Sequence, residues 1–310
     1  MGSADGRPTL LVGSGFFITR DGHVMTNANV TYMADRIWVE HRGIPYAAEL
    51  IGGDPFSNIS IVRLLTRPEN IRFIHLGNQD EMPTIASLVL AITCELGMEP
   101  RPSFGMVTGR NTSYGERILP TVYLRTDIPS DGGEGGSPVF DMSGNFIGVM
   151  VASLPEIRSS FVLPARAARR VRDDILFSGE VTYGWFGLQT RELADLEHGT
   201  RVVIEKVFPA SPAAGSGLRP GDVLLRVGDN MIRNDDDLRM ATFFIRANQD
   251  ITVRVRRDET EYELPMRVGK RVTDPYMLPT SNDDVSEAGE NGISPAAEAA
   301  QPAEATLPSP

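Results

Sequence analysis

The chain has 310 residues, of which 41% are apolar and 23% charged, a composition typical of a globular protein with about two domains. The formal net charge of −11 argues against a nucleic-acid binder, which needs a basic face to displace counterions from phosphates. A single cysteine, Cys94, excludes an intramolecular disulfide and a cysteine-rich zinc site. We expect no transmembrane segment, because the longest uncharged apolar run, residues 85–94, is half a membrane span, and no signal peptide in the given sequence, because residues 1–8 lack an apolar core. This leaves the compartment open.

Residues 9–163 predict a series of short strands, because runs of valine, isoleucine, phenylalanine and leucine alternate with turn-forming residues. The expected strands are residues 10–19, 36–40, 46–51, 59–64, 87–92, 122–126 and 146–153. Regular short strands of this kind are typical of an all-β sandwich or barrel. Pro164 then opens a helical pattern in which Ala167, Val171 and Ile175 recur every four residues, ending near Gly179.

Residues 181–270 form a second predicted unit of strands and one helix. The strand-like runs are residues 201–207, 222–227, 251–256 and 261–266. Asn234 starts a run of helix-capping residues, which predicts a helix whose apolar side chains include Leu238, Ala241 and Ile245. We therefore expect an N-terminal extension (1–8), a first domain (9–178) and a second domain (181–270).

Residues 271–310 differ in composition from the rest of the chain. They contain seven acidic residues, one basic residue and six prolines. Such a segment has too little apolar surface to offset the entropy of ordering. We predict a disordered, acidic tail rich in proline and alanine; its role as a solvated tail or linker and its role as a binding segment both stay open.

Six short strings of the first unit, which fall into four segments, occur in a fixed order. Residues 13–18 read GSGFFI and are followed by DGHVMTNANV at 21–30, DPFSNISIVR at 54–63, TD at 126–127, GEGGSPVF at 133–140 and SFVLP at 160–164. In sequence and spacing these segments resemble the trypsin-like serine proteases of the HtrA family. The resemblance implies a mainly β fold, the chymotrypsin/trypsin-like double β-barrel, and the family activity of a serine endopeptidase.

The second unit resembles the PDZ domain that follows the protease domain in this family. The matching strings are GWFGL at 184–188, SPAA at 211–214, GL at 217–218 and PGDVL at 220–224. A PDZ domain accepts a C-terminal peptide as an added strand and holds its carboxylate with backbone N–H groups. The resemblance implies a peptide-binding site made by Gly184, Trp185, Phe186, Gly187, Leu188, Leu238, Ala241 and Ile245.

The resemblance places Asn29, Asn58 and Gly135 where the family has its catalytic histidine, aspartate and serine. An amide is no general base near neutral pH, and glycine offers no nucleophile. We therefore expect a catalytically degenerate protein, a pseudoprotease that is not an enzyme. Ser137 is the weak alternative nucleophile, as the only hydroxyl residue in the loop 133–138. None of the four histidines falls at the base position; they are His23, His41, His75 and His198.

Residues 131–135 suggest two further hypotheses for the cleft that is the active site in the family. The backbone N–H groups of Gly133 and Gly135 correspond to the family's oxyanion hole and could receive a carbonyl or carboxylate oxygen. Asp131 and Glu134 could hold a metal ion, although the chain has no paired histidines or cysteines at metal-ligand spacing. We expect no resident metal and no cofactor.

These features favour a non-catalytic HtrA-like protein that binds peptide C-termini, or unfolded and partner proteins, through its PDZ domain. It would act as an adaptor, regulator or chaperone-like factor. The alternatives are a serine endopeptidase with a rearranged active site and a metal or anion binder in the degenerate cleft. Nucleic acid is not an expected partner, and a homo-oligomer stays open. The resemblance implies protein quality control in the periplasm or cell envelope.

Overall fold

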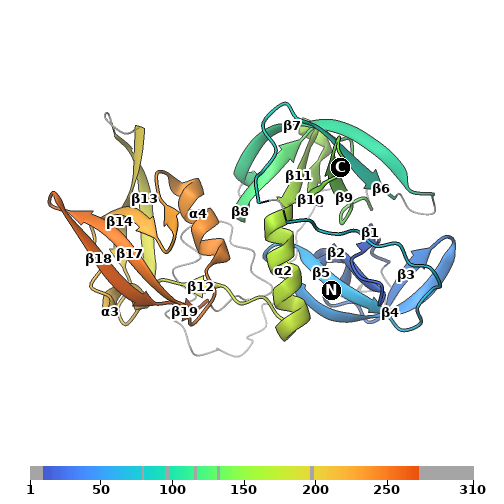
Figure 1. The fold of residues 1–310 in the computed structure, drawn as a ribbon, viewed down its shortest axis with the longest axis horizontal. Coiled ribbons are helices and arrows are strands. Elements are labelled where there is room, and N and C mark those ends of the chain that lie inside the picture. Colours follow the sequence, from blue (N-terminus) through green and yellow to red (C-terminus); the bar gives the residue numbers. More distant parts are fainter. Residues whose placement is uncertain are drawn as a thin grey trace, which may run out of the picture.

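The computed structural model describes residues 10–271, apart from 79, 95–97, 115–116, 131–132 and 196–198. The expected N-terminal extension and the acidic tail lie outside the described residues. Figure 1 shows two units, with helix α2 (Ala165–Ser178) standing between them. The larger unit holds two layers of β-structure, and the smaller one holds a sheet flanked by helix α4 (Asp235–Phe244).

The first half of the larger unit is an antiparallel five-stranded sheet. In spatial order its strands are β1 (Gly15–Phe17), β2 (His23–Asn27), β5 (Ile59–Leu64), β4 (Ile44–Asp54) and β3 (Ile37–His41). A single helical turn, α1 (Ala28–Thr31), follows β2. The prediction for residues 59–64 is confirmed, whereas the predicted strand 10–19 shrinks to β1, which pairs with β2 over three residues.

The second half closes into a barrel, so that no edge strand is left unpaired. Its strands are β6 (Leu88–Thr93), β7 (Arg101–Tyr114), β8 (Arg117–Thr126), β9 (Pro138–Asp141), β10 (Phe146–Leu154) and β11 (Ser159–Pro164), with the short 3₁₀ helix η1 (Pro155–Ile157) between the last two. Strand β7 was not predicted, because its glycines and polar residues interrupt the apolar pattern. Pairing with β6 and β8 nevertheless holds it in the barrel.

Helix α2 begins directly after Pro164 and ends before Gly179, as predicted. Gly179 has a φ of +77°, the left-handed conformation that glycine adopts at a helix C-terminus without steric cost. The fully buried Val171 and Ile175 belong to one core with Ile61 and Leu163, from the two halves of the larger unit. Helix α2 therefore joins the five-stranded sheet to the barrel through a shared apolar core.

The smaller unit is a sheet with a short strand pair beside it. The sheet contains β13 (Leu188–Asp195), β14 (Gly199–Val207), β15 (Val223–Val227), β17 (Asp250–Arg257) and β18 (Thr260–Arg267), with β16 (Asn230–Met231) paired to β15. Strand β12 (Gly184–Trp185) pairs with β19 (Gly269–Lys270), and α3 spans Pro212–Gly215. The side chain of Asn234 accepts a 2.8 Å hydrogen bond from the N–H of Asp237, which confirms the predicted cap of α4. Ile245, expected on this helix, follows its last residue in extended conformation.

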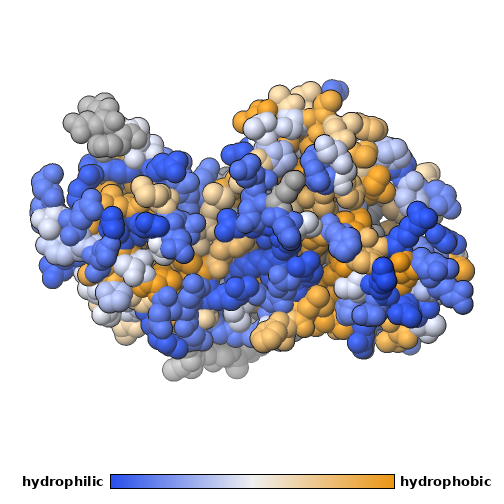
Figure 2. Space-filling model, viewed as in Figure 1, coloured by the Kyte–Doolittle hydropathy of each residue, from blue (hydrophilic) through white to orange (hydrophobic). Residues whose placement is uncertain are grey.

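The two units contact each other through α4 and α2. Arg246 donates two hydrogen bonds, of 2.8 and 2.7 Å, to Oδ1 of Asp174, and the Arg170 guanidinium lies 5.0 Å from the centre of the Phe243 ring. Figure 2 shows hydrophilic residues over much of the smaller unit and apolar residues over the barrel, where Leu88 and Phe104 are exposed. In the described part of the chain, no helix has both the length and the hydropathy needed to span a membrane.

Candidate functional site

The three positions matched to the family's catalytic residues lie together between the sheet and the barrel. Oδ1 of Asn58 accepts a 2.9 Å hydrogen bond from the N–H of Asn29, and its Nδ2 donates to the Val151 carbonyl at 2.9 Å. Asn27 donates to the same carbonyl at 3.3 Å. A Cβ added to Gly135 would lie 2.6 Å from Nδ2 of Asn27. We call Asn27, Asn29, Asn58 and Gly135 the asparagine cluster.

The conformation and hydrogen-bond partners in the asparagine cluster fit amide side chains. Asn58 has a φ of +60°, a left-handed conformation that asparagine tolerates better than most side chains. Its Nδ2 donor meets a carbonyl, so a carboxylate in the same place would set oxygen against oxygen. At position 135, any side chain would need the Asn27 amide to move. The family's catalytic groups therefore cannot be restored here without rearrangement of these neighbours.

Among the described residues, Ser137 makes no contact with any of the three described histidines. The Ser137 side chain is fully buried, and its Oγ donates a 2.7 Å hydrogen bond to the Glu134 carbonyl. Nδ1 of His23 lies 2.9 Å from Oγ1 of Thr19, and burial, reinforced by Arg63, lowers the pKa of this ring. The rings of His41 and His75 pack on Phe17 and Phe73, and His198 lies outside the described residues.

Two hydrogen bonds from Ser14 hold the backbone of the loop 133–138. The N–H of Ser14 donates to the Gly135 carbonyl at 2.9 Å, and its Oγ donates to the Gly133 carbonyl at 3.0 Å. Within the described part of the chain, the N–H groups of Gly133 and Gly135 donate no hydrogen bond. Free, fixed N–H groups can receive a carbonyl oxygen. The oxyanion-hole role of these two residues stays a prediction.

Of the two carboxylates expected to hold a metal ion, only Glu134 lies within the described residues. The described residues contain no group of three or more histidine, cysteine, aspartate or glutamate side chains that could hold a metal ion. The buried carboxylate of Glu134 lies 3.3 Å from Nη2 of Arg101. Asp131 lies outside the described residues. Glu134, the described carboxylate of the loop 133–138, is therefore paired with an arginine.

The two parts of the expected peptide site are brought together in the smaller unit. Phe186 shares one core with Leu238, Ala241 and Ile245, each at most 8% exposed. The N–H of Gly184 donates to the Ile245 carbonyl at 3.2 Å. These apolar side chains face the domain core in the absence of a ligand, so their contact with a peptide stays a prediction.

Glycine at position 187 is required by the fold. Its φ is +74°, and a Cβ there would lie 2.1 Å from Cβ of Ser211. The carbonyls of Phe186 and Gly187 accept 2.9 Å hydrogen bonds from the N–H groups of Ala213 and Phe208. Because C=O and N–H of a trans peptide point in opposite directions, the N–H groups of Gly187 and Leu188 point away from those partners.

A contact that the sequence did not reveal links the two units near the asparagine cluster. Tyr183 donates a 2.5 Å hydrogen bond to Oδ2 of Asp54, which also accepts 2.5 Å from the Ser57 hydroxyl. Burial raises the pKa of Asp54, and burial together with Asp54 raises the pKa of Tyr183 well above its usual value. The turn that begins at Asp54 also carries Asn58. The only sequence signal was the DP dipeptide at residues 54–55.

Comparisons with known proteins agree with this architecture. The family model of the trypsin-like peptidase domain matches residues 13–149, and that of the PDZ domain matches residues 184–268. A probable periplasmic serine endoprotease, DegP-like, from Marinomonas is 28% identical over 291 residues, which cover 90% of this chain and 61% of that protein. The mitochondrial serine protease HTRA2 of Bos taurus is 30% identical over 278 residues, covering 80% and 58%.

Solved structures of the HtrA-type protease AlgW share the fold. The structure with a decapeptide has a TM-score of 0.69 at 25% identity, covering 85% of this chain and 84% of that one. The structure with a tripeptide has a TM-score of 0.73 at 25% identity, covering 85% and 91%. The chain spans about three-fifths of the length of the curated relatives it matches.

These comparisons correct one expectation from the sequence. The replacements at positions 29, 58 and 135 led us to expect that the chain is not an enzyme. That expectation is contradicted, because the relatives that match most of the chain are named as serine endoproteases. The expectation rested on three side chains, whereas the trypsin-like peptidase and PDZ models match residues 13–149 and 184–268. With both domains matched in order, the chain belongs to the HtrA family, with a trypsin-like peptidase domain followed by a PDZ domain.

Proposed function

We propose that this chain serves HtrA-type proteolysis: its PDZ domain binds the C-terminus of a polypeptide, and its trypsin-like domain receives the adjoining segment. One observation carries the binding step, namely the loop 184–188 held against α4 with the N–H groups of Gly187 and Leu188 turned away from the loop's internal hydrogen bonds. The AlgW structures, which contain a decapeptide or a tripeptide, support peptide binding in a protein of the same fold.

The binding step follows from backbone chemistry. The N–H groups of Gly187 and Leu188 offer two donors to a terminal carboxylate, and charge-assisted bonds of this kind are stronger than neutral ones. The rest of the peptide would extend the domain as an added strand. Leu238 and Ala241 would contact the terminal side chain after a small opening of the helix against the sheet. The ligand is thus a polypeptide with a free carboxylate and an apolar last residue.

The binding test compares two forms of one peptide. A labelled decapeptide ending in valine is titrated against the full chain with a free terminal carboxylate and, separately, with a terminal amide. We expect micromolar affinity for the free acid and at least a tenfold loss for the amide, because the amide removes the charged acceptor. Equal affinity for the two forms would refute carboxylate capture by the PDZ domain.

The names of the relatives favour endopeptidase activity in the trypsin-like domain. We propose that this activity, with a rearranged site, uses Ser137 as nucleophile and the N–H groups of Gly133 and Gly135 as oxyanion donors. The Ser137 hydroxyl would first have to leave the Glu134 carbonyl and meet a base. Denatured casein incubated with the chain and with Ser137→Ala tests this. Fragments from the unaltered chain alone support the role; fragments from both, or from neither, reject it.

We propose that the protein acts in the cell envelope, in protein quality control. The support is that several bacterial relatives are named as probable periplasmic proteins. Fractionation of the producing cell with an antibody to the PDZ domain tests it. Recovery with periplasmic markers is the expected result, and recovery with ribosomes and cytoplasmic enzymes would overturn it.

A further inference from the structure

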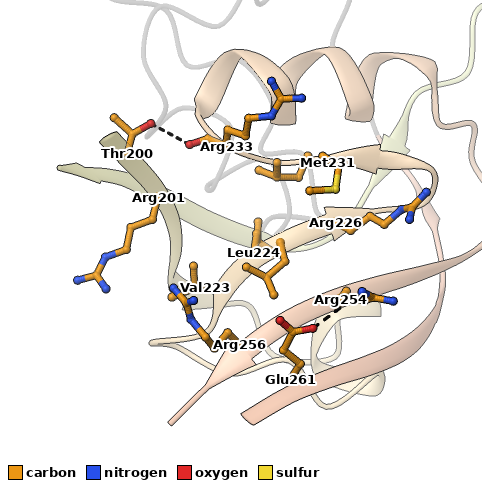
Figure 3. A pocket seen from close by; sticks show the side chains of 12 residues that line it. Thr200, Arg201, Val223, Leu224, Arg226, Met231, Arg233, Arg254, Arg256 and Glu261 are labelled. Atoms are coloured by element: carbon orange, nitrogen blue, oxygen red, sulfur yellow. Dashed lines mark hydrogen bonds and ion pairs between the residues drawn. The ribbon is translucent and has the colours of Figure 1, made fainter. Parts of the chain in front are cut away.

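A second site on the PDZ domain lies apart from the expected peptide site. It is a cavity of about 310 Å³, and none of the residues expected to bind the peptide lines it. Figure 3 shows an apolar floor that includes Val223 and Met231, with arginine side chains around it. We call it the arginine pocket; its arginines are Arg201, Arg226, Arg233, Arg254 and Arg256.

The pocket lies on the face of the sheet that points away from the domain core. Along β17, Val253 and Val255 are buried in the domain core, so Arg254 and Arg256 lie on the opposite face of the strand. The strand register places Arg254 beside Arg226 and Arg256 beside Val223. Because the lining comes from paired strands, the pocket is part of the rigid scaffold.

The charges around the pocket are unbalanced. Five guanidinium groups and one carboxylate, that of Glu261, line it. Two of the five arginines are already in ion pairs, Arg254 with Glu261 and Glu263 and Arg233 with Asp237. Arg226 is fixed by hydrogen bonds to the carbonyls of Gly228 and Asp229, at 3.1 and 3.2 Å. Among the described residues, the side chains of Arg201 and Arg256 have neither a hydrogen bond nor an ion pair, although their backbones are paired in the sheet. Like charges held together are destabilising unless an anion joins them, and this excess occurs in a chain of net charge −11.

The chain contains an anionic segment of matching charge. Residues 283–290 read DDVSEAGE, with four carboxylates and no basic residue. The segment lies outside the described residues. Asp283 lies twelve positions beyond Arg271, the last described residue, and an extended chain of twelve steps reaches about 40 Å. A domain of this size has a diameter of about 30 Å, so the segment can reach any face of it.

We propose that residues 283–290 bind the arginine pocket of the same chain. The carboxylates pair with the pocket's arginines, Arg201 and Arg256 among them. Binding within one chain needs little intrinsic affinity, because a short linker gives an effective concentration of about a millimolar. The acidic segment thereby neutralises the outer face of the PDZ domain and leaves the peptide site at Gly187 free.

Competition in the full chain tests the proposal. The probe is a fluorescent peptide of residues 280–293, added to the unaltered chain and to a chain carrying D283N, D284N, E287Q and E290Q. We expect the altered chain to bind the probe at least tenfold more tightly, because its own segment no longer competes. Equal binding by the two chains would overturn the proposal and indicate that the pocket takes an acidic segment of another protein.

A second comparison locates the bound probe. In the chain with the neutralised segment, Arg254→Gln with Arg256→Gln should weaken probe binding at least tenfold. The matched control is Arg219→Gln, an arginine of the same domain outside the pocket, which should leave binding unchanged; equal thermal midpoints confirm folding. Binding that survives the pocket variant overturns the proposal. Binding of the decapeptide at the peptide site is measured in the same samples, so failure here is distinguishable from failure of the proposed function.

Discussion

The asparagine cluster and the peptide site of the PDZ domain each correspond to a functional site of the family, but they differ in what they retain. In the cluster, the fold brings positions 29, 58 and 135 to one place, while the side chains there are two amides and a glycine. In the proposed peptide site, the groups that would bind the carboxylate are backbone N–H groups, which depend on conformation rather than on side-chain identity. Side-chain chemistry can change while a fold persists, whereas backbone chemistry persists with the fold.

The largest effect on stability and peptide binding is expected at Gly187, where the proposed binding role depends on backbone conformation. Gly187→Ala would place a Cβ about 2 Å from Ser211 at a positive φ, and we expect a loss of about 3 kcal/mol in unfolding free energy with loss of peptide binding. The matched control, Gly228→Ala, also has a positive φ but open space for the added Cβ, so it should cost about 1 kcal/mol. Denaturant titration measures both. Equal losses would show that conformation alone, and not close packing on Ser211, constrains residue 187.

A smaller effect is expected where side chains define the site. Asn58→Asp removes the Nδ2 donor to the Val151 carbonyl and sets a carboxylate against it, which should cost about 2 kcal/mol in unfolding free energy. Asn29→His, at an exposed side chain of the same cluster, should change stability by less than about 0.5 kcal/mol. Thermal and chemical unfolding would reveal the difference. If Asn58→Asp is neutral, the cluster is not adapted to an amide.

The contact of Arg246 with Asp174 joins the domain of the asparagine cluster to the domain of the proposed peptide site. Arg246→Ala removes two hydrogen bonds to Asp174. Since the arginine side chain is half exposed, we expect a loss of only about 1 kcal/mol. Calorimetry should then show two separated transitions instead of one. A single transition in the variant would mean that the apolar contact of Phe243 suffices to couple the domains.

The smallest expected effect is a pH dependence in the first sheet. Burial, together with Arg63, lowers the pKa of His23 in the folded state below its usual 6.5. The neutral ring is therefore favoured by folding, so its contribution is complete above pH 6.5 and is lost as the pH falls through the lowered value. His23→Gln should flatten the fall of unfolding free energy between pH 7 and pH 5. Denaturant midpoints across that range give the slope, and an unchanged slope contradicts the assignment.

Much of the fold was predictable from local patterns. The strand at residues 59–64, the helix after Pro164 and the cap at Asn234 follow from apolar periodicity and from capping chemistry, which act over a few residues. Strand β7 was missed because pairing with two neighbours, and not its own composition, makes it a strand. Ile245 was placed on a helix that ends one residue earlier.

The sequence by itself determined the family, the order of the two domains and the identity of the residues at positions 29, 58 and 135, because these are properties of the linear chain. Only the tertiary structure decided that Asn27 and Asn58 share the Val151 carbonyl, that Tyr183 bonds to Asp54 and that five arginines surround one cavity. Each of these contacts joins residues from different elements, and strand register and domain packing set such distances. Short-range patterns describe which elements form, while long-range packing decides which side chains meet.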